Sequence, residues 1–288
     1  MNLKKYLDSF NLNNQTILIT GAAGGIGSAL SFHLASLNVK LMLAGRTGLK
    51  LDNLKSEILK KYPNTDVEIL TLDLCSKKSV DEFIENVKNI KIDFFFHNAG
   101  VYNVPRHNTE LGFDNIFQTN CLMPYYISKR LMDNFKQNRT KLVFMGSIAY
   151  NYSKIDQSDI QFLKCKKPSK VYGNSKRVAM AALSELFKEK GVEFSIIHPG
   201  VTLTHMTNHY PKIINWLVKI VLGLVCPKPK IACLSFLYAT NHHTDFDEWI
   251  GPKIFNTWGN PKISKTKLEE NDYKFCHDVL ESMIQNFD

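Results

Sequence analysis

The chain has 288 residues, of which 44% are hydrophobic and 22% are charged, and its formal net charge is +9. This composition is ordinary for a soluble globular protein, and the lysines are too scattered, without interleaved aromatic residues, to indicate a nucleic-acid site. No apolar run is long enough to span a membrane, and the first residues lack the apolar core of a signal peptide, so we expect a cytoplasmic protein.

The first motif is a glycine-rich turn between an apolar strand at 15–20 and an apolar-periodic helix at 28–37. The turn reads Gly21-Ala22-Ala23-Gly24-Gly25-Ile26-Gly27. In a nucleotide-binding βαβ unit, Gly21 would permit the tight turn, Gly25 would let a pyrophosphate approach, and Gly27 would let helix and strand pack closely. Free N–H groups at the helix N-terminus would then face the phosphates. Although the spacing differs from Gly-x-Gly-x-x-Gly and also suits a flexible loop, the strand–helix context favours a nucleotide site.

The second predicted strand, 39–44, is followed by Arg46 rather than by a carboxylate. In a βαβ site this position meets the adenosine ribose, where an acid binds a free 2′-hydroxyl and a guanidinium suits a 2′-phosphate. Arg46 therefore favours NADP over NAD, the alternative being a solvated residue after a strand.

Small and polar residues follow the next two predicted strands. Strand 67–72 is followed by Asp73 and Leu74, where the aspartate would bond an adenine amino group, cap a helix beginning near Ser76, or do both. Strand 92–97 is almost wholly apolar and ends at Asn98-Ala99-Gly100, whose small residues would let a ligand lie against the backbone.

A long helical region, 110–138, is interrupted by Pro124 and contains Asn120. Asparagine is unfavourable inside a helix, so we expect its side chain to have a specific hydrogen bond to make. A fifth strand at 141–145 ends at Gly146-Ser147, and a polar insertion extends from there to Lys170.

Tyr172 and Lys176 are four residues apart at the start of a helix that we predict to extend to Lys190. This spacing places both side chains on one face of the helix. A nearby ammonium group would lower the pKa of the phenol from its usual value of about 10, so that the tyrosine exchanges protons near neutral pH. Carbonyl reduction and alcohol oxidation need such a group. Alone, the pair also fits a half-buried tyrosine beside a solvated lysine.

A sixth strand at 193–197 precedes His198-Pro199-Gly200. Strands that alternate with helices predict an α/β fold of the Rossmann type, a doubly wound parallel sheet in three α/β/α layers. The residues singled out above all follow strands, so we expect them to gather at the carboxyl edge of the sheet, where such folds bind ligands.

Together these motifs resemble the short-chain dehydrogenase/reductase family over about 16–204. The finer resemblance is to its retinol-dehydrogenase-like branch, because the interval between Ser147 and Tyr172 is long and His198-Pro199-Gly200 is followed by a threonine and an apolar helix. His97 departs from the family, where an asparagine is common. The resemblance implies a catalytic tetrad of Asn120, Ser147, Tyr172 and Lys176. It implies cofactor contacts from Gly21, Ala23, Gly25, Ile26, Gly27, Arg46, Asp73, Leu74, Asn98, Ala99, Gly100, Tyr172, Lys176, Pro199, Gly200, Val201 and Thr204.

In the implied mechanism, Tyr172 is the general acid/base, and Lys176 lowers its pKa and bonds the nicotinamide ribose. Ser147 would stabilise charge on the substrate oxygen. Asn120 would hold a water that connects Lys176 to solvent. The cofactor would carry the hydride.

Beyond Gly200, residues 203–227 form an apolar segment too short to span a bilayer. We interpret it as a substrate lid, the alternative being an interfacial helix that contacts a membrane peripherally. Helices are predicted at 228–240 and 265–287, the second within a helical extension at 262–288, with a short edge strand at 253–256. The chain 1–288 is expected to form a single domain.

The sequence therefore predicts an NADP-dependent oxidoreductase that transfers hydride between nicotinamide and an apolar carbonyl or alcohol, such as a retinoid-like or lipid-like aldehyde or ketone. The alternative is a non-catalytic regulator that binds NADP. No metal site is expected, because the histidines lack acidic or cysteine partners at ligand spacing. The resemblance also implies a homo-oligomer.

Overall fold

The computed structural model describes residues 12–200, 232–254, 258–285 and 287. Its described strands form one eight-stranded sheet in the order β3-β2-β1-β4-β5-β6-β7-β8, parallel from β3 to β7 and antiparallel only between β7 and β8. The strands are β1 (Thr16–Thr20), β2 (Lys40–Gly45), β3 (Asp66–Thr71), β4 (Phe94–His97), β5 (Lys141–Met145), β6 (Phe194–Ile197), β7 (Glu248–Ile254) and β8 (Trp258–Lys265).

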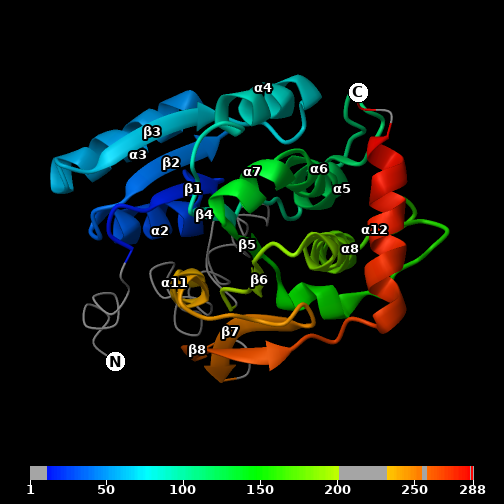
Figure 1. Ribbon diagram of the computed structural model, residues 1–288. Helices are drawn as coiled ribbons and strands as arrows, with labels where there is room; N and C mark the ends of the chain where they lie inside the picture. The colour runs from blue at the N-terminus through cyan, green and yellow to red at the C-terminus, as the bar shows by residue number, and fades with distance from the viewer. Residues whose placement is uncertain (1–11, 201–231, 255–257, 286, 288) are drawn as a thin grey trace, which may run out of the picture.

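Helices cover both faces of this sheet (Figure 1). One face carries α2 (Gly25–Ala35), α3 (Gly48–Lys61) and α11 (Leu234–Thr240). The other carries α4 (Lys77–Val87), α5 (Asn115–Phe117), α6 (Met123–Arg130), α7 (Met132–Asn138) and α8 (Pro168–Lys190), with α12 (Glu270–Ile284) packed against α8. The predicted three-layer, doubly wound fold is confirmed.

The strands are apolar because both faces of the sheet are covered. In β1, Leu18 belongs to the core beneath α4–α8, whereas Ile17 and Ile19 belong to the core beneath α2, α3 and α11. All three side chains are fully buried. Buried parallel strands therefore appear as continuous apolar runs rather than alternating ones.

The strand order reverses next to β1. The chain proceeds from β1 outward to β2 and β3, then returns to place β4 on the other side of β1. The connections after β1 and β4 consequently leave in opposite directions, which opens a crevice at the carboxyl ends of these two strands. The topology thus fixes where a ligand site of this fold lies.

The helical region predicted at 110–138 begins at Asn115, after Asp114 caps α5 by accepting hydrogen bonds from the Ile116 and Phe117 N–H groups. A π-helical turn, Gln118–Leu122, separates α5 from α6. Pro124 has no N–H to donate, so the carbonyl of Asn120 loses its ordinary helical partner four residues ahead. The proline predicted to interrupt the helix therefore coincides with this wider turn.

The C-terminal part differs most from its prediction. The edge strand predicted at 253–256 is replaced by a hairpin, in which β7 pairs with β6 and the mostly exposed β8 forms the sheet edge. The helical extension predicted from 262 is wrong at its start, because residues 262–265 lie in β8 and the helix begins at Glu270. Polar edge strands carry little apolar alternation, so this one left a weak signal.

Three predictions lie outside the described residues: the lid at 203–227 and the cofactor contacts of Val201 and Thr204. Within the described ranges, no helix has both the length and the apolarity needed to cross a membrane.

Gly173 offers a test of how closely α8 packs on the rest of the fold. A Cβ at this position would lie 2.2 Å from the carbonyl oxygen of Ala149. We expect Gly173→Ala to lower the free energy of unfolding by about 1–3 kcal/mol, because the helix must move away from the turn Ile148–Tyr152. Urea unfolding measures this change.

Gly48→Ala is the matched control, since a Cβ at Gly48 meets no atom within 4 Å. Its stability should equal or slightly exceed that of the wild type. Equal stability of the two alanine variants would contradict the close packing of α8.

Candidate active site

A cavity of about 1090 Å³ opens at the carboxyl ends of the central strands. This volume exceeds the usual size of a site for one small ligand, about 300–1,000 Å³. Nearly all of the predicted site residues in the described chain line it, namely Gly21, Ala23, Gly25, Ile26, Gly27, Arg46, Asp73, Leu74, Asn98, Ala99, Gly100, Ser147, Tyr172, Lys176, Pro199 and Gly200. Asn120 is the exception, and its side chain hydrogen-bonds Val101, which does line the cavity.

The glycine turn forms one end of the cavity. Gly21 has φ +64°, a conformation that favours glycine, and a Cβ there would lie 2.8 Å from the Cα of Ala99. A Cβ at Gly27 would lie 2.3 Å from the carbonyl oxygen of Gly21. The amide of Asn98 ties the turn to β4 by donating to the carbonyls of Thr20 and Gly21, at 2.9 and 3.1 Å.

The N-terminus of α2 faces this turn without a side-chain cap or an acidic residue in its first turn. Its first N–H groups therefore have no side-chain acceptor and offer partial positive charge to an anion. This donor set fits a pyrophosphate, and the binding of one there stays a prediction.

Two cations line the cavity beyond β2. Arg46 follows the strand directly, and Lys50 lies in the first turn of α3, four residues later. Both side chains are exposed, and no carboxylate occupies the first turn of α3. Lys50 was not predicted, although its spacing from Arg46 at a helix start is a signal that could have identified it.

Asp73 does not cap α4. The cap is Ser76, whose side chain accepts from the Ser79 N–H. Asp73 instead accepts a hydrogen bond from the Cys75 N–H at 2.9 Å while lining the cavity. Of the two roles considered for Asp73, only contact with a ligand remains as a prediction.

Tyr172 is partly buried at the centre of the cavity, beside Ser147 and Tyr102. Burial raises the pKa of Tyr172 to about 12. A hydrogen bond with Ser147 lowers this pKa, but by less than burial raises it. The ring of Tyr102 meets that of Tyr172 edge to face, with centroids 5.2 Å apart. The prediction that Lys176 lowers the pKa of Tyr172 is wrong in this structure, because desolvation of the phenolate dominates.

Lys176 is fully buried on the same face of α8. Its Nζ donates to the carbonyl of Met145, at the end of β5, at 2.8 Å, and lies 4.8 Å from the centre of the Phe144 ring. Burial lowers the pKa of Lys176 to about 7. The ammonium is therefore held toward the strand end rather than toward the phenol, and it loses its proton easily.

Asn120 makes the specific bonds that its unfavourable helical position suggested. Its Oδ1 accepts from the Val101 N–H at 2.8 Å, and its Nδ2 donates to the Val101 carbonyl at 2.9 Å and to the Ser175 hydroxyl at 3.1 Å. The side chain is fully buried, and both its amide oxygen and its amide nitrogen are hydrogen-bonded. A water molecule that binds Asn120 would therefore have to bind its main chain.

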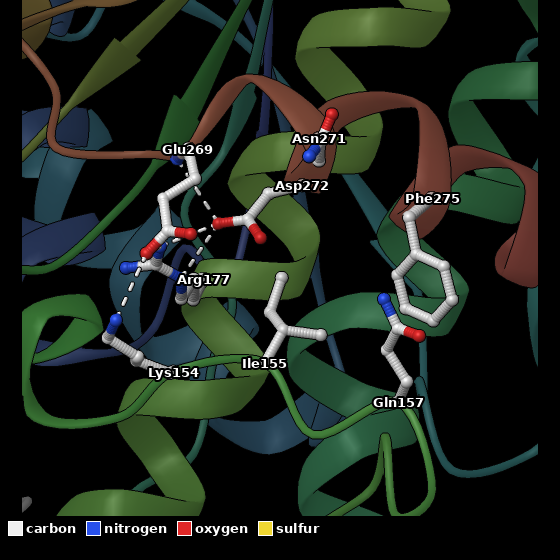
Figure 2. Close-up of a pocket in the computed structure, with 8 residues that line it drawn as sticks. All are labelled: Lys154, Ile155, Gln157, Arg177, Glu269, Asn271, Asp272 and Phe275. Carbon is white, nitrogen blue, oxygen red and sulfur yellow. Dashed lines mark hydrogen bonds and ion pairs between the residues drawn. The ribbon is translucent and has the colours of Figure 1, made fainter.

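A second, smaller pocket of about 200 Å³ lies on the opposite side of α8, between the insertion and α12 (Figure 2). Here Arg177 donates from Nη2 to Asp272 at 2.6 Å, and Glu269 and Lys154 lie beside them. The guanidinium is buried, so this contact helps to hold α12 against the helix that carries Tyr172 and Lys176.

Comparison with known proteins identifies similar chains. Residues 15–213 match a family model described as short chain dehydrogenase. The chain is 27% identical to polyprenol dehydrogenase from Homo sapiens, covering 71% of this chain and 68% of that protein. It is 32% identical to retinol dehydrogenase 12 from Mus musculus, covering 70% and 66%. A solved structure of an uncharacterized protein from Mycobacterium paratuberculosis is similar in fold, with a TM-score of 0.74, 21% identity, and coverage of 97% and 96%.

His97, at the end of β4, makes the free energy of unfolding depend on pH in a way that can be tested. Burial, with the nearby charge of Lys176, lowers the pKa of His97 to about 3, from 6.5 in an unfolded chain. Between these values the unfolded state binds the additional proton, so the free energy of unfolding falls as the pH falls, by about 1.4 kcal/mol per pH unit for this group.

We expect His97→Asn to reduce the loss of stability between pH 6.5 and pH 4.5, measured by urea unfolding at several pH values. His198, which burial affects similarly, remains in both proteins and keeps part of the slope. Parallel profiles for variant and wild type would contradict this assignment.

Proposed function

Because the chain belongs to the short-chain dehydrogenase/reductase family, we propose that it transfers hydride between NADP(H) and an apolar carbonyl or alcohol. Membership of the family makes it an oxidoreductase acting on CH–OH or C=O groups, of the retinol-dehydrogenase-like branch. The observation that carries the proposal is that Tyr172, Ser147 and Lys176 line the same cavity as the glycine turn.

The cofactor would be held by the residues that line the cavity from the glycine turn to Gly200. The uncapped N-terminus of α2 would bind the pyrophosphate, and Asp73 and Leu74 would border the adenine. When bound, NADP(H) would supply the hydride, and its oxidised ring would add a positive charge beside Tyr172.

Tyr172 would supply the proton in the direction of carbonyl reduction. Its raised pKa keeps the phenol protonated at neutral pH, which is the form that an acid requires. Ser147 would donate a hydrogen bond to the substrate oxygen and stabilise the charge that develops there.

Lys176 would bond the nicotinamide ribose and replace the proton that Tyr172 gives up. A pKa of about 7 suits a group that both accepts and releases a proton at neutral pH. We also propose that a water on the main-chain carbonyl of Asn120 connects Lys176 to solvent, since the side chain of Asn120 is engaged with Val101.

An apolar substrate is supported by the cavity wall next to Tyr172, which contains Val101, Val104, Pro105 and Ile148. Two relatives are named for polyprenol and retinol, which are apolar alcohols. The alternative of a non-catalytic regulator finds no support, since a sensor needs no acid/base residues. The single domain, the homo-oligomer and the peripheral membrane contact stay predictions.

We expect Tyr172→Phe to lower turnover at least a hundredfold, because the acid is lost, while NADPH affinity stays nearly intact. A screen of aldehydes and ketones with NADPH, and of alcohols with NADP⁺, read at the nicotinamide absorbance, would first identify a usable substrate. Fluorescence titration would report NADPH affinity. Turnover by the variant at the wild-type rate would refute the role of Tyr172.

We expect NADPH to bind more tightly than NADH, since Arg46 and Lys50 would both contact the 2′-phosphate. Arg46→Ala should weaken NADPH binding about tenfold or more and leave NADH binding nearly unchanged, because a charge-assisted hydrogen bond contributes about 1.5–3 kcal/mol. Isothermal titration with both cofactors measures this difference. Equal loss for the two cofactors, or a wild-type preference for NADH, would overturn the preference.

A further inference from the structure

The loop 101–108, between β4 and α5, forms one wall of the cavity through Val101, Tyr102, Val104, Pro105 and His107. Its two ends are held by asparagines on the elements that follow it. Asn120 binds both polar main-chain groups of Val101, as described above. Asn115 donates to the carbonyl of Pro105 at 3.0 Å and accepts from the N–H of His107 at 3.3 Å.

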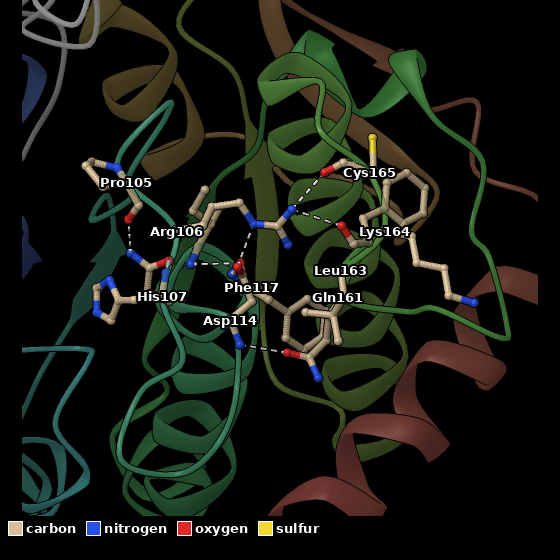
Figure 3. A network of polar contacts seen from close by, with 12 residues as sticks. Pro105, Arg106, His107, Asp114, Phe117, Gln161, Leu163, Lys164 and Cys165 are labelled. Atoms are coloured by element: carbon tan, nitrogen blue, oxygen red, sulfur yellow. Dashed lines mark hydrogen bonds and ion pairs between the residues drawn. The ribbon is translucent and has the colours of Figure 1, made fainter.

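Arg106, between the two residues that Asn115 binds, connects this loop to the insertion between β5 and α8 (Figure 3). Its Nε donates to Asp114 at 2.7 Å, and Asp114 is buried. Its Nη1 donates to the carbonyls of Phe162 and Cys165, at 3.1 and 2.8 Å. Three acceptors from two separate segments therefore converge on one guanidinium.

The insertion is in turn tied to the catalytic helix. Asn174, two residues after Tyr172, donates to the carbonyl of Ile160 at 2.7 Å. Gln161 accepts from the Asp114 N–H at 2.8 Å. The loop 101–108, the insertion and α8 are thus joined by side chains around one side of the cavity.

We propose that Arg106 is a positioning residue for substrate binding. It locks the loop 101–108 to the insertion and so holds the ring of Tyr102 against that of Tyr172. The reacting carbon of the substrate must lie beside Tyr172. This inference rests on the proposed function and deepens it, because it makes the substrate wall a single unit rather than two independent loops.

The three acceptors require the forked shape of arginine. Lysine carries the same charge and can pair with Asp114, but its single ammonium is not shaped to bind that carboxylate and two carbonyls in fixed directions. Arg106→Lys thus keeps the charge balance around Asp114 while releasing the insertion. Arg106→Gln removes the charge as well and leaves the buried carboxylate of Asp114 without its charged partner, so this variant is more liable to misfold.

The kinetic experiment uses NADPH and straight-chain aldehydes from hexanal to dodecanal. For Arg106→Lys we expect KM for the aldehyde to rise about tenfold, with kcat within about threefold of the wild type, because the substrate must now order the loop. A merely structural loss would reduce the fraction of active enzyme, which lowers kcat and leaves KM unchanged. That result would overturn the proposal.

Asp272→Asn is the matched control. It weakens the Arg177 contact on the far side of α8, which is also a short guanidinium–carboxylate pair, without touching the cavity wall. Its KM for the aldehyde should equal that of the wild type. A KM raised as much as in Arg106→Lys would assign the effect to general loosening of α8.

A double-mutant cycle with Tyr102→Ala tests whether Arg106 acts through that ring. Each single variant should lower kcat/KM about tenfold, and the combined variant should lose little more than either one, because both changes remove the same arrangement. A combined loss of about a hundredfold would show that the two residues act independently and would refute the coupling.

Hydrogen exchange tests the lock without any substrate. Amides of 101–108 and of 160–165 should exchange at least several-fold faster in Arg106→Lys than in the wild type or in Asp272→Asn. Unchanged exchange overturns the proposal even if the enzyme is active. If exchange is faster in Arg106→Lys but the wild-type protein reduces no aldehyde, the proposed function is refuted and the link between the loop and the insertion is established.

Discussion

The fold of this chain depends on the second and third turns of α8, where consecutive residues contact different parts of the molecule. A Cβ at position 173 would strike the turn after β5, position 174 binds the insertion, 175 binds the π-helical turn, 176 binds the end of β5 and 177 binds α12. Because every direction around the helix is occupied, α8 can neither rotate nor slide without breaking a contact. Tyr172 and Lys176 therefore reach the cavity in one orientation.

Burial is the largest influence on the pKa of three groups in this part of the molecule, Tyr172, Lys176 and His97. The phenol of Tyr172 holds its proton more tightly than usual, whereas Lys176 and His97 give theirs up more easily. All three shifts favour the uncharged form, as expected where the sheet edge excludes water. The part of the site around these three residues therefore carries little charge of its own.

The polar groups around the cavity divide between two tasks. Exposed cations and uncapped N–H groups at the β1–α2 and β2–α3 connections suit an anionic ligand. On the other side, Asn115 and Asn120 bind the backbone of the loop 101–108, and Arg106 of that loop binds Asp114 and two carbonyls of the insertion. Buried backbone groups outside regular structure need such partners. The end of the cavity at the glycine turn thus leaves its donors available to a ligand, whereas the end at the loop 101–108 uses its polar side chains to hold the wall in place.

The sequence alone determined the features that depend on local pattern: the apolar strands, the glycine turn, the helix that carries Tyr172 and Lys176, and the strand ends where polar residues gather. Periodicity and residue type suffice for these, since parallel strands place their carboxyl ends at one edge. Tertiary structure decided what depends on distant residues. Arg106 and the Cys165 carbonyl are 59 positions apart, the edge strand β8 has a weak apolar pattern, and the direction of the Tyr172 pKa shift follows from how deeply the assembled fold buries the phenol. No short-range pattern records these contacts, because they exist only once separate segments pack together.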